Sequence, residues 1–197
     1  MMASTGSPLI DGRTGTLSRE TIVVMLTDLF RTNGFEGVSI ASIAKATGIG
    51  KSSLYHHFPG GKDEMATAVM EAVGSWVTQN LVEPLLSSGT RQERIDAMLE
   101  NVTTLYDGGN QPCVIASMMV GAEAGPVFPA IRAAFADWMN ALQQALQETG
   151  ASPTAAREAA QDAIARLQGA LLLCRALDDR APFGAALIAA RRDLIAA

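Results

Sequence analysis

One short stretch near the N-terminal end of the chain carries side chains suited to binding nucleic acid. They are Lys51, Ser52, Ser53, Tyr55 and His56. Lysine and serine can contact phosphates or base edges, and the hydroxyl of tyrosine can donate a hydrogen bond to phosphate. The exposed face of an ordinary helix has a similar composition, so DNA contact and a solvated surface helix are both open interpretations of these residue types alone.

The residues around this stretch predict two short helices joined by a tight turn. Ser39 is a suitable N-cap for the first helix, because its hydroxyl can accept a hydrogen bond from a free backbone N–H. Gly48 can end that helix, since glycine readily adopts a positive φ. Ile49, Leu54 and Phe58 supply apolar anchors for the second helix. This pattern is typical of a helix-turn-helix, in which the second helix reads DNA.

The whole N-terminal third resembles the DNA-binding domain of the TetR/AcrR family of bacterial transcriptional repressors. The matching motifs include Gly34-Phe35, residues 46–49 (ATGI) and residues 51–58 (KSSLYHHF). The resemblance implies DNA contacts at Ser39, Lys51, Ser52, Ser53, Tyr55, His56, Lys62 and Arg19. For Arg19, an ordinary surface arginine is the alternative. Gly50 stands where many relatives have a serine cap, which weakens the start of the recognition helix slightly, although glycine is tolerated there.

The remainder of the chain resembles the ligand-binding domain of the same family in length and helix layout. Residues 167–175 (LQGALLLCR) point to the subgroup of lincomycin-resistance repressors. We therefore expect an all-α fold of nine helices in three parts. These are a flexible arm at 1–16, a helix-turn-helix domain at 17–61, and a ligand-binding and dimerisation domain at 62–197. Helices are expected at 18–33, 39–48, 49–58, 62–80, 91–106, 113–123, 127–148, 152–177 and 183–195, with a break at 84–90.

Charge is distributed unevenly along the chain. The net charge is −5, yet residues 1–62 contain six basic and four acidic side chains. A basic DNA-binding end on an acidic body favours local steering toward DNA, and the small basic excess predicts that tight binding needs a dimer. The apolar runs are shorter than the ~20 residues of a membrane span, and residues 1–16 lack an apolar signal core. We expect a cytoplasmic bacterial protein.

The chain offers little for catalysis. His56 and His57 are its only histidines, and adjacent residues on a helix point apart, so a metal pair is not expected. The Gly60-Gly61-Lys62 triplet lacks the spacing of a phosphate-binding loop. Cys113 and Cys174 lie in apolar runs, which favours buried thiols, with a redox switch as the alternative. No catalytic residue, metal or cofactor is expected. A helical enzyme or small-molecule carrier that does not act on DNA is the alternative function.

The effector pocket is expected among the central helices, as the resemblance implies. Methionine and aromatic side chains suit an adaptable apolar site, although the same residues at helical spacing also form ordinary cores. The candidates are Trp76, Met98, Met118, Met119, Phe128, Trp138 and Leu172. The helix expected at 113–123 carries few charges, so we expect a small apolar effector oriented by Ser117, Glu123 or Asn140.

The last two helices are expected to form the dimer, because both are apolar on more than one face. By resemblance, two such helices from each subunit form a four-helix bundle, and the alternative is that these faces close the monomer core. The candidate interface residues are Ile164, Leu167, Leu171, Phe183 and Leu187. A homodimer would place two recognition helices in successive major grooves, about 34 Å apart. The predicted function is a ligand-released repressor of a palindromic double-stranded DNA operator.

Overall fold

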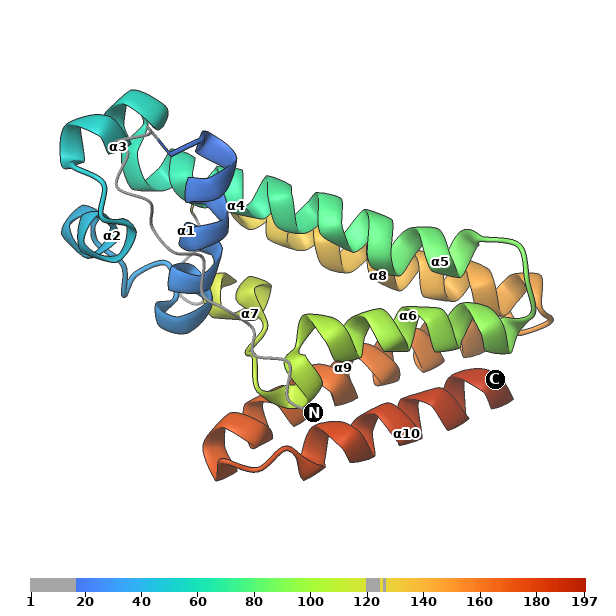
Figure 1. The fold of residues 1–197 in the computed structure, drawn as a ribbon. Helices are drawn as coiled ribbons and strands as arrows, with labels where there is room; N and C mark the ends of the chain where they lie inside the picture. The colour runs from blue at the N-terminus through green and yellow to red at the C-terminus, as the bar shows by residue number, and fades with distance from the viewer. Residues whose placement is uncertain (1–16, 120–124, 126) are drawn as a thin grey trace, which may run out of the picture.

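The computed structural model describes residues 17–119, 125 and 127–197, and within these residues it contains helices and no strand (Figure 1). The α-helices are α1 (Arg19–Asn33), α2 (Ile40–Thr47), α3 (Lys51–His57), α4 (Gly61–Val77), α5 (Glu83–Leu86), α6 (Arg91–Leu105), α7 (Val114–Met119), α8 (Phe128–Glu148), α9 (Pro153–Leu177) and α10 (Ala181–Ala196). A π-helical turn, η1 (Thr78–Val82), and a 3-10 turn, η2 (Asp107–Gly109), complete the list. The predicted all-α fold is confirmed.

The first three helices form a small cluster, and α2 begins and ends at the residues expected from the sequence. Ser39 and Ser42 form a reciprocal capping box at the start of α2, and Gly48 ends α2 with a φ of 71°. Apolar side chains from each helix close the core between them, with Phe30 on α1, Ile43 on α2 and Leu54 on α3 all fully buried. The cluster thus fixes α3 by its apolar anchors and leaves the opposite face of α3 to solvent.

A single helical rod leads away from this cluster, because α4, η1 and α5 follow one another without a break (Figure 1). We expected the helix to end near residue 80 with a break from Pro84, but the rod continues to Leu86. Proline at this position leaves the carbonyl of Asn80 without its normal helical donor. The side chain of Asn101 on α6 donates to that carbonyl at 2.8 Å, which supports the continuation.

The other long helices pack around the rod. α8 lies alongside α4, and α9 and α10 form a closely packed pair on the side away from α3 (Figure 1). A two-pronged ion pair joins Arg191 on α10 to Asp96 on α6 at 2.6 and 2.8 Å, and its hydrogen bonds lower the pKa of the Asp96 carboxyl. Arg166 on α9 binds Asp193 on α10 at 2.7 Å. These bonds tie α10 to both of its neighbours.

Two sequence predictions meet the limits of the described residues. The helix expected at 113–123 is described as α7 only to Met119, and Glu123 lies outside the described residues. The expected flexible arm at 1–16 lies outside them as well.

Cys113 and Cys174 are both buried with free thiols. Among the described helices, none has the length and apolar character required to cross a membrane.

Candidate DNA-binding surface and ligand cavity

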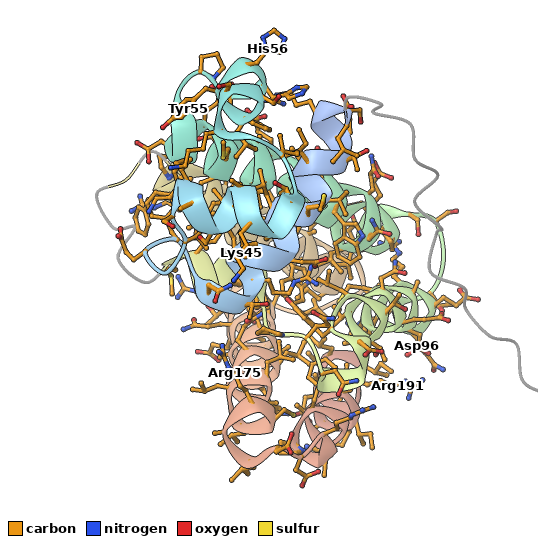
Figure 2. All side chains as sticks on the ribbon, turned by 60° about the vertical axis from the view of Figure 1, so that its left-hand side comes forward. Lys45, Tyr55, His56, Asp96, Arg175 and Arg191 are labelled. Atoms are coloured by element: carbon orange, nitrogen blue, oxygen red, sulfur yellow. The ribbon has the colours of Figure 1, made fainter. Side chains whose placement is uncertain are left out.

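The exposed face of α3 is the candidate DNA-binding surface. Lys51, Ser52, Ser53, Tyr55 and His56 are all exposed on it. Leu54 and Phe58, which are fully buried, anchor the helix from the other side. Figure 2 shows Tyr55 and His56 at one end of the molecule, with Arg175, Asp96 and Arg191 toward the other end. The structure therefore brings together five of the eight predicted DNA-contacting residues on one outward surface.

The start of α4 supports the tyrosine on this surface. Gly61 has a φ of 66°, and a Cβ atom there would lie 3.5 Å from the Tyr55 ring. The ring therefore packs against the backbone at the start of the rod, while 48% of the Tyr55 side chain stays exposed. His57 is half-buried beside Phe58, with ring centroids 6.4 Å apart. His56 is exposed, and its ring lies edge-on to that of His57, with ring centroids 5.7 Å apart.

The other three predicted contacts have structural partners. The Ser39 hydroxyl accepts from the backbone N–H of Ser42, so it caps α2. Lys62 donates to the carbonyl of Phe35 at 3.2 Å and lies over the Phe35 ring, 4.1 Å from its centre. Arg19 lies over the Phe58 ring and 3.7 Å from Glu64. These side chains hold α1, α2 and α4 in position around α3.

Lys45 is an exposed cation on α2 that the sequence argument did not select (Figure 2). It forms no ion pair with any residue that the structure describes. Only its place in the basic N-terminal third could have indicated it.

A cavity of about 240 Å³ lies where the three-helix cluster meets the helices behind it. α1, α4, α7 and α8 all contribute to its wall, together with the rod at Leu81 and the residues around η2. Its described lining residues are Thr27, Arg31, Ala72, Val73, Trp76, Val77, Leu81, Leu105, Tyr106, Pro112, Cys113, Val114, Ile115, Ala134, Phe135 and Trp138. Nearly all are apolar or aromatic, so the cavity suits an apolar ligand.

Three polar side chains of the wall differ in how they are satisfied. Arg31 donates to Gln111 at 3.0 Å and to Asp28 at 3.3 Å. Tyr106 accepts from Gln168 at 3.3 Å, and burial raises the pKa of its phenol well above the ordinary value. The buried indole Nε1 of Trp138 has no hydrogen-bond partner among the described residues.

Two of the seven predicted pocket residues, Trp76 and Trp138, line this cavity. The other five lie elsewhere. Met98 and Met118 are fully buried in the core, Phe128 packs near Arg132, and Met119 is exposed. Leu172 is 70% exposed on the outer face of α9. Helical periodicity shows which residues turn inward, but it does not show which inward residues border a cavity.

The polar residues expected to orient the effector, as far as they are described, also lie outside the cavity wall. Asn140 is exposed on α8, away from the cavity wall, and Ser117 on α7 is half-buried but absent from the wall.

The predicted interface residues pack inside their own subunit. Ile164, Leu167, Leu171 and Phe183 are buried in the monomer core, and Leu187 is half-buried. The outer surface of α9 and α10 instead exposes Leu172, Leu173, Leu177 and Ile188. A shallow apolar groove crosses this surface, lined mainly by small residues such as Ala165, Gly169 and Ala185. α9 thus has an apolar face toward the core, with Ile164, Leu167 and Leu171, and an apolar face toward solvent, with Leu172, Leu173 and Leu177. The predicted residues of α9 lie on the face toward the core, because the sequence pattern does not distinguish the two.

The cavity residues that sequence reasoning missed come mostly from helices, including Thr27 and Arg31 of α1. Arg31 entered the argument only as a charge, and Gln111 only as part of a loop. Tyr106 and Phe135 fall in the helices expected at 91–106 and 127–148, where the sequence pattern does not mark a cavity. No sequence signal joins α1 to the segment around Gln111, because their contact spans 80 residues of chain. Within the described residues, no group of three or more histidine, cysteine or acidic side chains could hold a metal ion.

Comparison with known proteins agrees with this architecture. Residues 25–69 match the family model for bacterial regulatory proteins of the TetR family, and residues 92–187 match the C-terminal domain model for LmrA/YxaF-like transcriptional regulators. The transcriptional regulator LmrA of Bacillus subtilis is 28% identical over 160 residues, which cover 79% of this chain and 85% of LmrA. YxaF of the same organism is 24% identical over 169 residues, covering 84% of this chain and 88% of YxaF.

Solved structures share the fold. A TetR transcriptional regulator from Legionella pneumophila superposes with a TM-score of 0.79 at 21% identity, covering 91% of this chain and 98% of that one. A TetR-family regulator from Agrobacterium tumefaciens gives a TM-score of 0.76 at 22% identity, covering 88% and 95%. The helix-turn-helix motif, the helical body behind it and the two matched domains together place this chain in the TetR family of transcriptional regulators, in the subgroup with an LmrA/YxaF-like C-terminal domain.

Proposed function

We propose that this regulator is a repressor that binds a palindromic operator as a homodimer and is released from it by a small apolar ligand. One observation carries the proposal. The apolar cavity is walled in part by α1 and α4, the helices that pack around α3 and its DNA-binding surface. Thr27 and Arg31 of α1 lie on one side of it, and Val73 and Trp76 of α4 on another. A molecule bound there would contact α1 and α4, which hold α3 in position.

The proposed dimer uses the outer face of α9 and α10. Leu172 and Ile188 are among the most exposed large apolar side chains of the described chain, and the groove between the two helices is apolar. The small residues that line the groove would let the helices of a second copy approach closely. Exposed leucine and isoleucine in a continuous patch mark an interaction surface, and burial of this patch in a four-helix bundle would stabilise the dimer.

Release follows from the cavity's position between the two parts of the molecule. The hydrogen bond from Arg31 to Gln111 is a polar link between α1 and the body, and it borders the cavity. A ligand shifts the regulator toward the non-binding state only to the extent that it prefers that state. A ligand that fits a wider spacing between α1 and α4 therefore lowers the affinity for operator. We assign DNA binding to residues 17–61 and ligand binding with dimerisation to 62–197, in a protein acting in the bacterial cytoplasm. Thr27 and Arg31 of α1 complete the wall of the ligand cavity.

The direct test is binding to DNA upstream of its own gene and the neighbouring genes, titrated across salt concentration. We expect tight binding to one palindromic site, with a steep decrease in affinity as salt rises. A panel of small apolar compounds is then screened for release of that complex. Weak binding that is equal on all DNA sequences, with no compound changing it, would contradict the proposal.

A further inference from the structure

Among the described residues, the indole N–H of Trp138 is the buried side-chain polar group that has no hydrogen-bond partner. Trp138 lines the cavity and is 3% exposed, and its Nε1 atom finds no acceptor among the described residues. A buried indole N–H normally has a hydrogen-bond partner. Leaving such a donor unpaired costs free energy, which an acceptor placed in the cavity would recover.

The hydroxyl, phenol and guanidinium groups of the wall are already engaged. The hydroxyl of Thr27 donates to the carbonyl of Val23 at 2.8 Å. The phenol of Tyr106 is bonded to Gln168, and Arg31 is bonded to Asp28 and Gln111. The charge of Arg31 is thus paired with a carboxylate, and its side chain is only 16% exposed. The cavity disfavours a cation next to Arg31, and the buried indole N–H of Trp138 requires an acceptor.

We propose that the ligand of this cavity is an apolar molecule with a neutral oxygen acceptor, such as a carbonyl or ether, and that this oxygen accepts the N–H of Trp138. The inference rests on the proposed ligand response and names the chemical class of the ligand. The aromatic side chains of Trp76, Phe135 and Trp138 surround the apolar part. Trp138 acts as the orienting residue, because it fixes which end of the ligand faces α8.

A matched pair of probes isolates this hydrogen bond. 2-Acetylnaphthalene and 2-isopropenylnaphthalene have nearly the same shape, but only the first has an oxygen acceptor. Both tryptophans of the chain line the cavity, so the intrinsic fluorescence of the full-length protein reports occupation without DNA. Each probe is titrated into the wild type, Trp138→Phe and the matched control Trp76→Phe. The ratio of the two affinities within one protein cancels any change in cavity size.

We expect the acetyl probe to bind about threefold to tenfold more tightly than the isopropenyl probe in the wild type and in Trp76→Phe, as one net hydrogen bond provides. In Trp138→Phe the ratio should fall to about one. An equal ratio in all three proteins, or no binding of either probe to the wild type, would overturn the inference.

A second measurement covers a Trp138→Phe protein that does not fold. The wild type has two indole N–H signals in a proton–nitrogen NMR spectrum, and Trp76→Phe identifies the one that belongs to Trp138. The acetyl probe should shift the Trp138 signal downfield and the isopropenyl probe should not. Probe binding is measured without operator, so the acceptor preference can hold even if ligands fail to release DNA, and the two proposals fail separately.

Discussion

At the scale of single residues, α3 shows why its orientation could be predicted. Leu54 and Phe58 are four residues apart and both are fully buried, so they lie on one face of the helix and fix the other face outward. The polar side chains of α3 then have nowhere else to point. The sequence does not show that Lys62 and Arg19 lie over aromatic rings, because Phe35 and Phe58 reach them only in the folded cluster.

Lys51 provides the most direct test of the DNA-binding surface. Lys51→Ala should weaken operator binding while leaving the fold and the dimer intact, because the side chain is exposed and unpaired among the described residues. Each lysine that neutralises a phosphate contributes about 0.9 to the slope of log affinity against log salt, so a dimer should lose about two. Arg175→Ala, at an exposed arginine on α9 outside the three-helix cluster, is the matched control. An unchanged slope would remove Lys51 from the interface.

Tyr106 predicts a loss of stability in alkali. Burial raises the pKa of its phenol in the folded state. The stability that this neutral phenol supports is therefore fully present below the unfolded pKa of about 10 and is lost as pH rises above it. The chain has two tyrosines, so in Tyr55→Phe any phenolate absorbance belongs to Tyr106.

We expect the phenolate band in Tyr55→Phe to appear together with unfolding, as followed by circular dichroism. Denaturant unfolding between pH 8 and 11 should show a shallower decline for Tyr106→Phe than for the wild type. Phenolate formation in a fully folded protein would show that the phenol is not held neutral by burial.

At the scale of elements, the helix starts could be predicted well and one helix end could not. Ser18, Ser39 and Ser152 accept hydrogen bonds from the backbone as N-caps should, because capping involves neighbours in sequence. The rod through Pro84 depends on Asn101, which lies 21 residues from the carbonyl it satisfies. A local pattern does not contain such a partner, so Pro84 was taken as a break.

The turn η2 offers a matched pair of glycines. Gly108 has a φ of 59° and open space around its Cβ direction, whereas Gly109 has a φ of 104° and a Cβ there would lie 2.9 Å from the Cβ of Phe183. Gly109→Ala should lower the free energy of unfolding by roughly 2–4 kcal/mol, from backbone strain and the clash with α10. Gly108→Ala should cost about 1 kcal/mol. Equal losses in denaturant unfolding would show that η2 does not pack tightly against α10.

At the scale of the whole molecule, the apolar surface that a monomer leaves exposed was the hardest feature to predict. α9 has two apolar stripes, and a pattern in one chain does not say which faces its own core and which faces a second copy. The position of the cavity was hard to predict for the same reason. Trp76 and Trp138 border it, whereas Met98, which also faces inward, does not.

Leu172 tests the proposed dimer. Leu172→Glu places a charge in the apolar groove of α9 and α10 without disturbing the monomer core, because the side chain is 70% exposed. We expect a monomer by analytical ultracentrifugation and at least a 100-fold loss of operator affinity, since each subunit reads half a palindrome. Leu86→Glu, an exposed leucine at the end of the rod, is the control. A dimer that survives Leu172→Glu would place the interface elsewhere.

In the proposed release, the rod of α4, η1 and α5 would act as a lever. It begins at Gly61, beside the Tyr55 ring, and passes the cavity at Val77. A rotation of roughly 5° about Val77 moves Gly61, which is ~24 Å away at ~1.5 Å per residue, by roughly 2 Å. Hydrogen bonds weaken steeply beyond their short optimal range. A small rearrangement around one bound molecule would therefore be enlarged at α3 into a displacement that breaks contacts with the bases, while every helix stays folded.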